Sequence, residues 1–129
     1  MRLSKTLSLI VMPERMAICH LPPNDYLPTT LGRAQFLSVT RTDEGYSIVL
    51  PEESVPTDWK AERGWRGLKV QGPLDFDLTG VLASLAAPLA EASVSIFAIS
   101  TYNTDYILVK ENDLEKAKQA LRASGHTLK

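Results

Sequence analysis

A run of mostly small or polar residues, Ser100-Thr101-Tyr102-Asn103-Thr104-Asp105, separates two apolar runs in the C-terminal part of the chain. Thr101 and Asn103 can offer neutral hydrogen bonds to a ligand. The carboxylate of Asp105 could accept charge-assisted hydrogen bonds from an ammonium group, worth roughly 1.5 to 3 kcal/mol. Asn, Thr and Asp are also preferred turn formers, because their side chains hydrogen-bond the local backbone. The spacing alone therefore favours a hairpin loop over a binding site.

A second group of candidate residues precedes an apolar segment with helical period. The loop 72–77 leads into a predicted helix over 79–91, whose start Asp77 or Thr79 could cap. Backbone N–H groups at such a helix N-terminus suit a carboxylate, and Gly80 would permit close approach. A free amino acid presents a carboxylate and an ammonium a few ångströms apart. The two groups of residues together therefore have the chemistry that an amino-acid site requires.

Other chemically reactive residues do not form convincing sites. Asp75 and Asp77 could suggest paired catalytic carboxylates or a cation site, but no third ligand or general base accompanies them, so capping and a solvated loop are favoured. Cys19 and His20 are neighbours that would point to opposite faces of a strand, which predicts a core cysteine and an exposed histidine. His126 stands alone near the C-terminus. A zinc site is therefore not expected, and the sequence indicates neither a metal nor a cofactor.

Two tryptophans flank a short basic segment. Trp59 and Trp65 lie close to Lys60, Arg63 and Arg66, so nucleic-acid stacking is possible in principle. A packing or interface role is favoured, because the formal net charge of the chain is −1. The phosphate-binding loop, the dinucleotide fingerprint and the G-x-S-x-G nucleophile motif are missing, which argues against the corresponding enzyme classes.

Length and composition are those of a globular protein. The chain has 129 residues, of which 44% are hydrophobic and 22% are charged. This length is sufficient to bury a core as one domain or two very small ones. The single cysteine excludes an internal disulfide and favours a reducing cytoplasm. No apolar run approaches the ~20 residues of a membrane span, and Pro13 interrupts the N-terminal apolar run, which favours a first strand over a signal peptide.

The second half of the chain alternates strands and helices in a regular order. We predict strands over 66–71, 94–100 and 105–110, the helix over 79–91, a second helix from residue 112, and a short edge strand over 126–128. The inner face of the first helix should carry Val81, Leu82, Leu85, Ala86 and Leu89, with Pro88 loosening its last turn. In the second helix the expected features are Asn112 as N-cap with Glu115 in a capping box, an inner face of Leu114, Ala117 and Leu121, and Gly125 as C-cap. The order βαββαβ is that of a ferredoxin-like α+β domain with an antiparallel sheet.

The first half echoes this order with its first helix nearly lost. Strands over 7–12 and 16–21 could pair as a hairpin around Pro13, and a proline-rich loop over 22–28 has room for little more than one helical turn. Strands over 36–42 and 46–50 should flank a tight turn in which Gly45 supplies a positive φ. A short helix could open at 51–53. Residues 55–64 are predicted to be a surface connection.

One predicted strand carries apolar residues on both faces. Ile96, Phe97, Ala98 and Ile99 follow one another, whereas a two-layer sheet with helices on one side leaves its other face open. We therefore expect this strand to be covered on both faces, by the sheet of the first half, by a second copy of the chain, or by both.

Several segments together resemble the ACT domain, a small βαββαβ regulatory module that binds amino acids. The resemblance begins with Thr79-Gly80-Val81-Leu82-Ala83-Ser84-Leu85-Ala86 and continues over residues 89–96. The run 97–109 resembles one branch of the family, the short tandem-ACT proteins related to the CASTOR amino-acid sensors and to the regulatory region of aspartate kinase. The match is most specific over residues 65–121.

The resemblance implies a ligand lying where the loop before the first helix meets the edge of a neighbouring ACT unit. It carries the ligand-binding role onto Asp75, Leu78, Thr79, Gly80, Val81, Thr101, Tyr102 and Asp105, beside which Asn103 would add a neutral partner. Leu78-Thr79-Gly80 stands where the family usually has Asp and Pro-Gly close to the helix start, which puts the identity of the ligand in question. The first half lacks a recognisable glycine-bearing loop and helix, so it should offer a surface without a complete second site.

These observations predict two ACT-like units, a degenerate one over 1–62 and a complete one over 63–129. The expected protein is cytoplasmic and non-enzymatic, binds a free amino acid, and passes on its presence by forming a homodimer or by contacting another ACT-containing protein. Neither nucleic acid nor membrane is an expected partner. The alternative is a structural or assembly module with a vestigial ligand site.

Overall fold

The computed structural model describes residues 6–72 and 79–129. The chain divides into two compact units, one made of Met1–Pro13 with Arg66–Lys129 and the other of Glu14–Trp65. We call them the helical unit and the hairpin unit. Two long strands, β1 (Ser8–Leu21) and β4 (Ala61–Val70), contribute residues to both.

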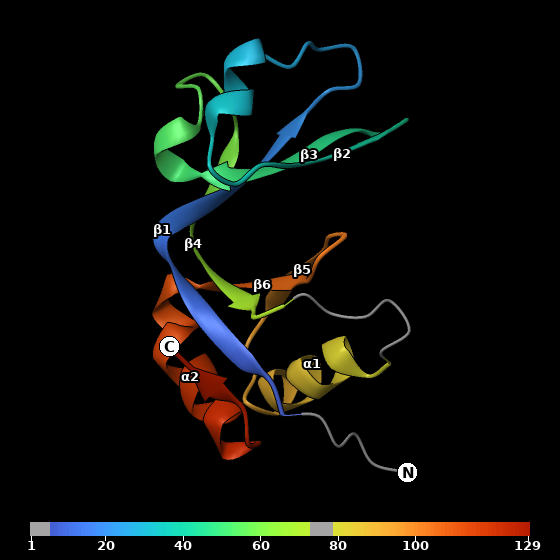
Figure 1. Cartoon of the computed structure of the whole chain (residues 1–129). Helices are drawn as coiled ribbons and strands as arrows, with labels where there is room; N and C mark the ends of the chain where they lie inside the picture. The colour runs from blue at the N-terminus through green and yellow to red at the C-terminus, as the bar shows by residue number, and fades with distance from the viewer. Residues whose placement is uncertain (1–5, 73–78) are drawn as a thin grey trace. The chain divides into compact units, whose positions relative to one another are not determined.

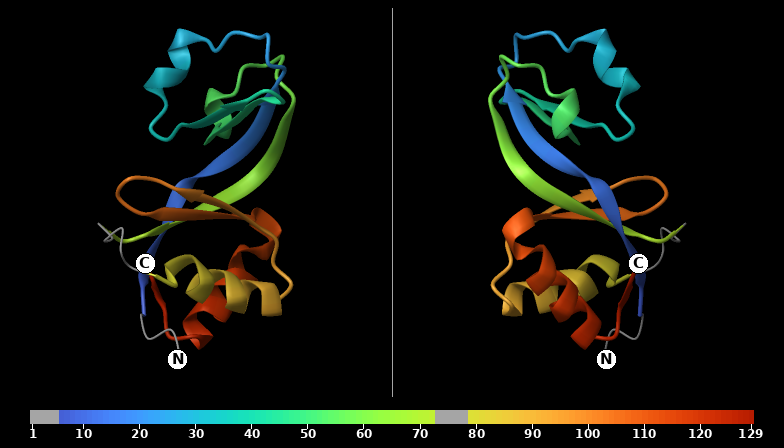
Figure 2. Two further views of the ribbon diagram at one scale, coloured as in Figure 1. Left: turned by 90° about the vertical axis from the view of Figure 1, so that its right-hand side faces the viewer. Right: turned by 90° about the vertical axis from the view of Figure 1, so that its left-hand side faces the viewer.

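The helical unit has the predicted order of elements. After β4 come α1 (Val81–Glu91), β5 (Ile96–Ser100), β6 (Asp105–Lys110), the 3-10 turn η3 (Glu111–Asp113), α2 (Leu114–Ala123) and β7 (Thr127–Leu128). β5 and β6 pair antiparallel from Ile96↔Val109 to Ser100↔Asp105. The two helices lie on the same side of this hairpin (Figures 1 and 2). This arrangement is an α+β fold whose strand pairs are mostly antiparallel.

One strand of this unit comes from the start of the chain. β7 pairs in parallel with β1 at Ser8↔Thr127 and Leu9↔Leu128, and β1 in turn neighbours β4. The apolar N-terminal run is therefore a sheet strand, as predicted. Its position between β7 and β4 was not foreseen, because pairing partners distant in sequence leave no local pattern.

The core of the helical unit lies between the sheet and the two helices. Its fully buried side chains include Leu9 from β1, Leu68 from β4 and Ile107 from β6, each with none of its surface exposed. The helices contribute the residues expected from their period, namely Val81, Leu85, Leu89, Leu114, Ala117 and Leu121. Leu82, which we predicted on the inner face of α1, is 39% exposed. It lies beyond the stripe defined by residues four apart, 81, 85 and 89.

Both helix starts differ from the prediction. α1 begins at Val81 with Gly80 as N-cap, so Thr79 does not cap it, and Asp77 lies outside the described residues. The capping box of Asn112 and Glu115 does not form, because the 3-10 turn η3 enters α2 directly and makes Asp113 the N-cap. At the other end of α2, Gly125 takes a positive φ of 98° just after the helix, as a C-terminal glycine should.

The hairpin unit is built on β1, β2 (Ser38–Thr42) and β3 (Gly45–Pro51), with β4 beside β1. The predicted turn is confirmed, since β2 and β3 pair from Ser38↔Val49 to Thr42↔Gly45 and Gly45 has a φ of 128°. The 3-10 turn η2 (Glu52–Ser54) stands close to the short helix predicted at 51–53, whereas η1 (Thr29–Arg33) follows the proline-rich loop 22–28, in which one helical turn was expected. A separate core fills this unit, with Ala17, Cys19, Leu21, Leu31, Ile48, Leu50 and Val55.

The predicted hairpin between residues 7–12 and 16–21 is wrong. These residues form the single strand β1, whose first part pairs with β7 and whose last part, from Met16, pairs with β3. Pro13 lies between these two paired stretches, where its missing N–H removes no hydrogen bond to either partner. The strand predicted at 66–71 is β4, which begins earlier than predicted, at Ala61.

The strand with apolar residues on both faces is only partly covered in one chain. β5 ends the sheet order, Ile96, Phe97 and Ile99 are half-buried, and Ala98 is exposed. The expected two-sided burial is therefore not reached within the single chain. In the described part of the chain, no helix is long and apolar enough to cross a membrane.

Candidate functional site

The polar run at residues 101–105 closes the β5–β6 hairpin. The Thr101 N–H donates to the carbonyl oxygen of Thr104 at 2.9 Å, and the Thr101 hydroxyl donates to the same oxygen at 2.7 Å. The Thr104 N–H donates back to the Thr101 hydroxyl oxygen at 3.3 Å. The turn formation predicted from residue type is thus confirmed, and it engages the N–H and the hydroxyl of Thr101.

Thr104, which was not among the predicted site residues, anchors this turn. It is only 4% exposed, and its hydroxyl donates to the carbonyl oxygen of Val70 at 2.7 Å. Val70 is the last residue of β4, the strand from which the chain leads toward α1. The tip of the hairpin is therefore fastened to the end of β4. Only the position of Thr104 among turn-forming residues hinted at this, since the sequence cannot show which threonine points inward.

The other predicted residues of the hairpin are exposed or half-buried. Tyr102 is 79% exposed, and Asn103 is exposed as well. Asp105 opens β6 opposite Ser100 and is half-buried. Among the described residues, no salt bridge engages its carboxylate.

The start of α1 offers backbone donors in the same unit. Gly80 has a left-handed φ of 80°, and no side chain of the described residues caps the helix. The first N–H groups of a helix have no acceptor within it, and such groups are the ones that can bind an anion. Thr79 is exposed, whereas the side chain of Val81 is buried. Any role of Val81 would therefore fall to its backbone.

The predicted site residues that the structure describes all belong to the helical unit. Asp75 and Leu78 lie outside the described residues. The hydrogen bonds of Thr101 and Thr104 run within the turn and to Val70 at the end of β4. The hydrogen bond from the Thr104 hydroxyl to the Val70 carbonyl connects the turn to β4.

Cys19, His20 and the tryptophans behave as predicted. Cys19 is buried in the core of the hairpin unit and its thiol is free, whereas His20 is exposed. Burial raises the pKa of the Cys19 thiol, and the nearby positive charge of Arg63 opposes part of this rise. Trp65 is 8% exposed and Trp59 packs on the core, which fits a structural role. The described residues contain no group of three or more His, Cys, Asp or Glu that could hold a metal.

His126, which the sequence left as a lone residue, is a buried structural link in the helical unit. It is 4% exposed, its Nδ1 accepts the N–H of Leu7 at 3.1 Å, and its Nε2 lies 3.1 Å from the carbonyl oxygen of Ser84. Because the amide can only donate and the carbonyl can only accept, these partners require the neutral ring with its proton on Nε2. No local pattern could have revealed this, since Leu7 is 119 positions away.

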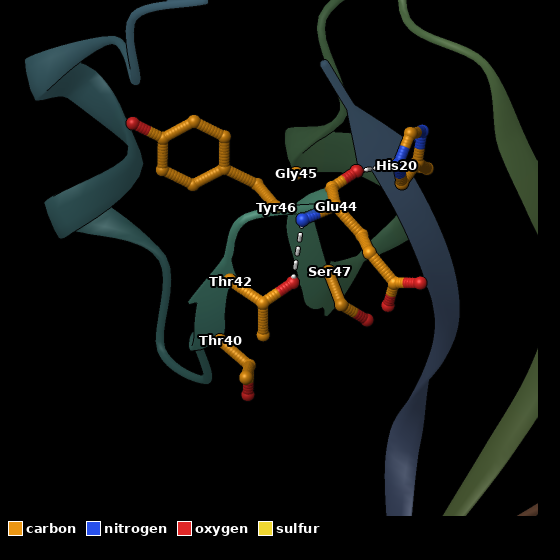
Figure 3. A pocket seen from close by; sticks show the side chains of 7 residues that line it. All are labelled: His20, Thr40, Thr42, Glu44, Gly45, Tyr46 and Ser47. Atoms are coloured by element: carbon orange, nitrogen blue, oxygen red, sulfur yellow. Dashed lines mark hydrogen bonds between the residues drawn. The ribbon is translucent and has the colours of Figure 1, made fainter. Parts of the chain in front are cut away.

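The hairpin unit contains a pocket that sequence reasoning also missed. It has a volume of about 210 Å³ and lies beside the β2–β3 turn (Figure 3). Hydroxyl groups, one imidazole and one carboxylate line it. These residues come from β1, β2, β3 and the turn, so only the pairing of the strands reveals them as a group.

Comparison with known proteins supports the resemblance. A family model described as ACT domain matches residues 60–123, and a second model, described as an N-terminal domain, matches residues 14–58. A Bos taurus protein named cytosolic arginine sensor for mTORC1 subunit 1 is 39% identical over 94 residues, which cover 64% of this chain and 29% of that protein. The chain thus corresponds to less than a third of the length of this curated relative.

Solved structures extend the likeness to nearly the whole chain. The crystal structure of a protein from Agrobacterium tumefaciens matches with a TM-score of 0.90 and 35% identity, covering 98% of this chain and 94% of that one. The ligand-free regulatory subunit of aspartate kinase from Thermus thermophilus matches with a TM-score of 0.65 and 9% identity, covering 94% and 99% of the two chains. The second likeness concerns the fold alone. The ACT-domain model over residues 60–123, taken with the βαββαβ order of the helical unit, shows that the chain belongs to the ACT-domain family.

Proposed function

We propose that this chain is a non-enzymatic regulatory protein that binds a free amino acid through its helical unit. The observation that carries the proposal is the hairpin turn that the Thr104 hydrogen bond joins to the end of β4, in the same unit as an α1 start that no side chain of the described residues caps. The turn offers the carboxylate of Asp105, and the helix start offers backbone N–H donors. These are the two partners that an amino acid needs.

In this proposal each end of the ligand has its own contact. The ligand carboxylate accepts hydrogen bonds from backbone N–H groups at Thr79, Gly80 and Val81, where the helix dipole favours negative charge. The ligand ammonium donates to Asp105. Asp75, Leu78, Thr101, Tyr102 and Asn103 complete the proposed set.

Arginine is the first amino acid to test. The bovine relative is named an arginine sensor, and its matching region overlaps this chain at 39% identity. Because the chain corresponds to only 29% of that protein, the wider signalling role implied by its name does not follow from the match. We also propose that the chain acts in the cytoplasm, and that residues 1–62 and 63–129 derive from two ACT units, of which the first is degenerate.

A thermal-shift screen against all twenty amino acids tests this function. A ligand at about one hundred times its dissociation constant should stabilise the fold by ~2.7 kcal/mol. We expect one amino acid or a small group to raise the melting temperature, and Asp105→Ala to abolish the rise. Asp58→Ala, which removes an exposed carboxylate from the hairpin unit, is the matched control and should leave the rise unchanged.

The same screen distinguishes amino-acid binding from the second candidate function, an assembly module with a vestigial ligand site. The half-buried Phe97 and Ile99 on β5 favour this candidate, because they leave apolar surface for a partner. If no amino acid shifts the melting temperature, the assembly module is the better account. An undiminished shift in Asp105→Ala would exclude that residue from the site.

A further inference from the structure

Three strands of the hairpin unit place polar side chains in one row. His20 on β1 pairs with Ser47 on β3, and Ser47 pairs with Thr40 on β2. Side chains of directly paired residues project from the same face of a sheet and lie beside one another. Together with Thr42 and Glu44 they line the pocket of about 210 Å³ (Figure 3).

The side chains of this polar row do not pack in the core of the hairpin unit. Successive residues of a strand point to opposite faces, and the neighbours Cys19, Leu21 and Ile48 are the ones that fill the core. His20 and Thr40 therefore belong to the other face, where both are exposed. A polar group that is not needed for packing is available to a ligand.

The backbone of the turn holds His20 in place. Gly45 has a φ of 128°, and a Cβ at this position would clash with the carbonyl oxygen of Leu21 and lie 2.8 Å from Nε2 of His20. The imidazole thus packs directly on the glycine, and its Nε2 lies 3.3 Å from the carbonyl oxygen of Glu44. Because a carbonyl only accepts, this contact puts the proton on Nε2 and leaves Nδ1 of the neutral ring as an acceptor.

The turn also orients the hydroxyl of Thr42. Its oxygen accepts the backbone N–H of Glu44 at 3.0 Å, so the hydroxyl proton stays free to donate. Of the residues that line the pocket, Glu44 is the one with a formal charge, and no Lys or Arg balances it there. The pocket therefore combines one negative charge with a set of hydroxyl groups.

From this combination we infer that the hairpin unit binds a small organic ammonium compound bearing hydroxyl groups, an amino alcohol. Its ammonium would donate to the Glu44 carboxylate, and its hydroxyls would exchange hydrogen bonds with Thr40, Thr42 and Ser47. The pocket volume is large enough for several water molecules, which is the size range of such compounds. A free amino acid fits less well, since its own carboxylate would face that of Glu44. This site is distinct from the amino-acid site proposed in the helical unit.

Nuclear magnetic resonance titration of the full ¹⁵N-labelled chain tests this site. The probes are ethanolamine and tris(hydroxymethyl)aminomethane, with glycerol and glycine as comparators, all in phosphate buffer. We expect saturable shifts of the amide signals of residues 40–47 with both amines, and dissociation constants in the millimolar range because the pocket is open to water. Glycerol lacks the ammonium and glycine brings a carboxylate, so both should bind at least about tenfold more weakly.

Variants identify the carboxylate responsible. Glu44→Gln keeps the shape of the side chain and should weaken the amines about tenfold or more. Asp43→Asn removes the same charge from the neighbouring turn residue, which does not line the pocket, and should change the dissociation constant less than about twofold. Thr40→Val gives a second variant that keeps the size of its side chain and should weaken binding about threefold.

Three results would overturn the inference. They are an absence of saturable shifts at residues 40–47 with either amine, equal affinity for glycerol, and equal affinity in Glu44→Gln. Glu44→Gln should also leave the amino-acid thermal shift of the whole chain unchanged. Failure of the amine titration therefore says nothing against the amino-acid site, and failure of the thermal-shift screen says nothing against this pocket.

Discussion

At the scale of single residues, a buried threonine gives the polar turn its position. Thr101, Tyr102 and Asn103 are exposed, whereas Thr104 is 4% exposed and donates to Val70 at the end of β4. A buried carbonyl or hydroxyl that loses its partner costs about 1 to 3 kcal/mol. The hydrogen bond of Thr104 should therefore matter more to the hairpin than the exposed residues around it.

Thr104→Val removes this hydroxyl while keeping the size of the side chain. We expect the free energy of unfolding to fall by about 1 to 3 kcal/mol, because the carbonyl oxygen of Val70 loses its donor. Urea denaturation followed by circular dichroism measures the change. Thr57→Val, at an exposed turn residue of the hairpin unit, is the matched control and should stay within about 0.5 kcal/mol of wild type. Equal losses in the two variants would contradict the anchoring role.

At the scale of elements, a buried histidine compensates for the hydrogen bond that a proline removes from α1. The carbonyl of Ser84 would normally accept the N–H of residue 88, but residue 88 is a proline and has no N–H. His126 Nε2 lies 3.1 Å from this carbonyl oxygen and supplies the missing proton. Through its Nδ1 the same ring holds the Leu7 N–H. α1, the start of the chain and the segment after α2 are thus joined by one side chain.

A double-mutant cycle tests this compensation. His126→Leu alone should destabilise the chain by about 1 to 3 kcal/mol for each partner left unsatisfied, Ser84 and Leu7. In the Pro88→Ala background the new N–H of residue 88 can satisfy Ser84, so the same substitution should cost about 1 kcal/mol less. Urea unfolding of the four proteins measures the coupling. Costs that agree within about 0.5 kcal/mol in the two backgrounds would show that proline and histidine act independently.

At the scale of the whole molecule, the half-buried residues of β5 suggest a surface for self-association. The β5 strand ends the sheet, and its residues alternate between faces. Ala98 pairs with Ile107, a core residue on the helix side, whereas Phe97 and Ile99 pair with Leu108 and Tyr106 on the other side. Because Phe97 and Ile99 are only half-buried in one chain, we propose that a second copy of the chain covers them.

Two neighbouring substitutions test this homodimer. Ile99→Lys places a charge on the proposed contact face and should convert the dimer to monomer, since an unpaired charge in an apolar interface is costly. Ala98→Lys, on the opposite face of the same strand, should leave the dimer intact. Sedimentation velocity at low micromolar concentration reports the species. A wild-type monomer, or equal dissociation in both variants, would contradict the proposed contact.

Much of the fold could be predicted from the sequence because its signals are local. The order of strands and helices after β4 follows from the apolar period and from glycine positions, and the turn at Gly45 follows from the need for a positive φ. The N-caps were mispredicted, since the 3-10 turn η3 and the left-handed Gly80 compete with side-chain capping. The proposed amino-acid site rests on residue type and family resemblance, and it stays a prediction.

Features that depend on distant residues became visible only in the folded chain. The single strand β1 pairs with both β3 and β7, so the hairpin predicted around Pro13 does not form. The hydrogen bond of Thr104 spans 34 positions, and that of His126 with Leu7 spans 119. The polar row of His20, Ser47 and Thr40 exists only through strand register. Periodicity and turn chemistry act over a few residues and are written in the sequence, whereas partners across a sheet are selected by the packing of the whole unit.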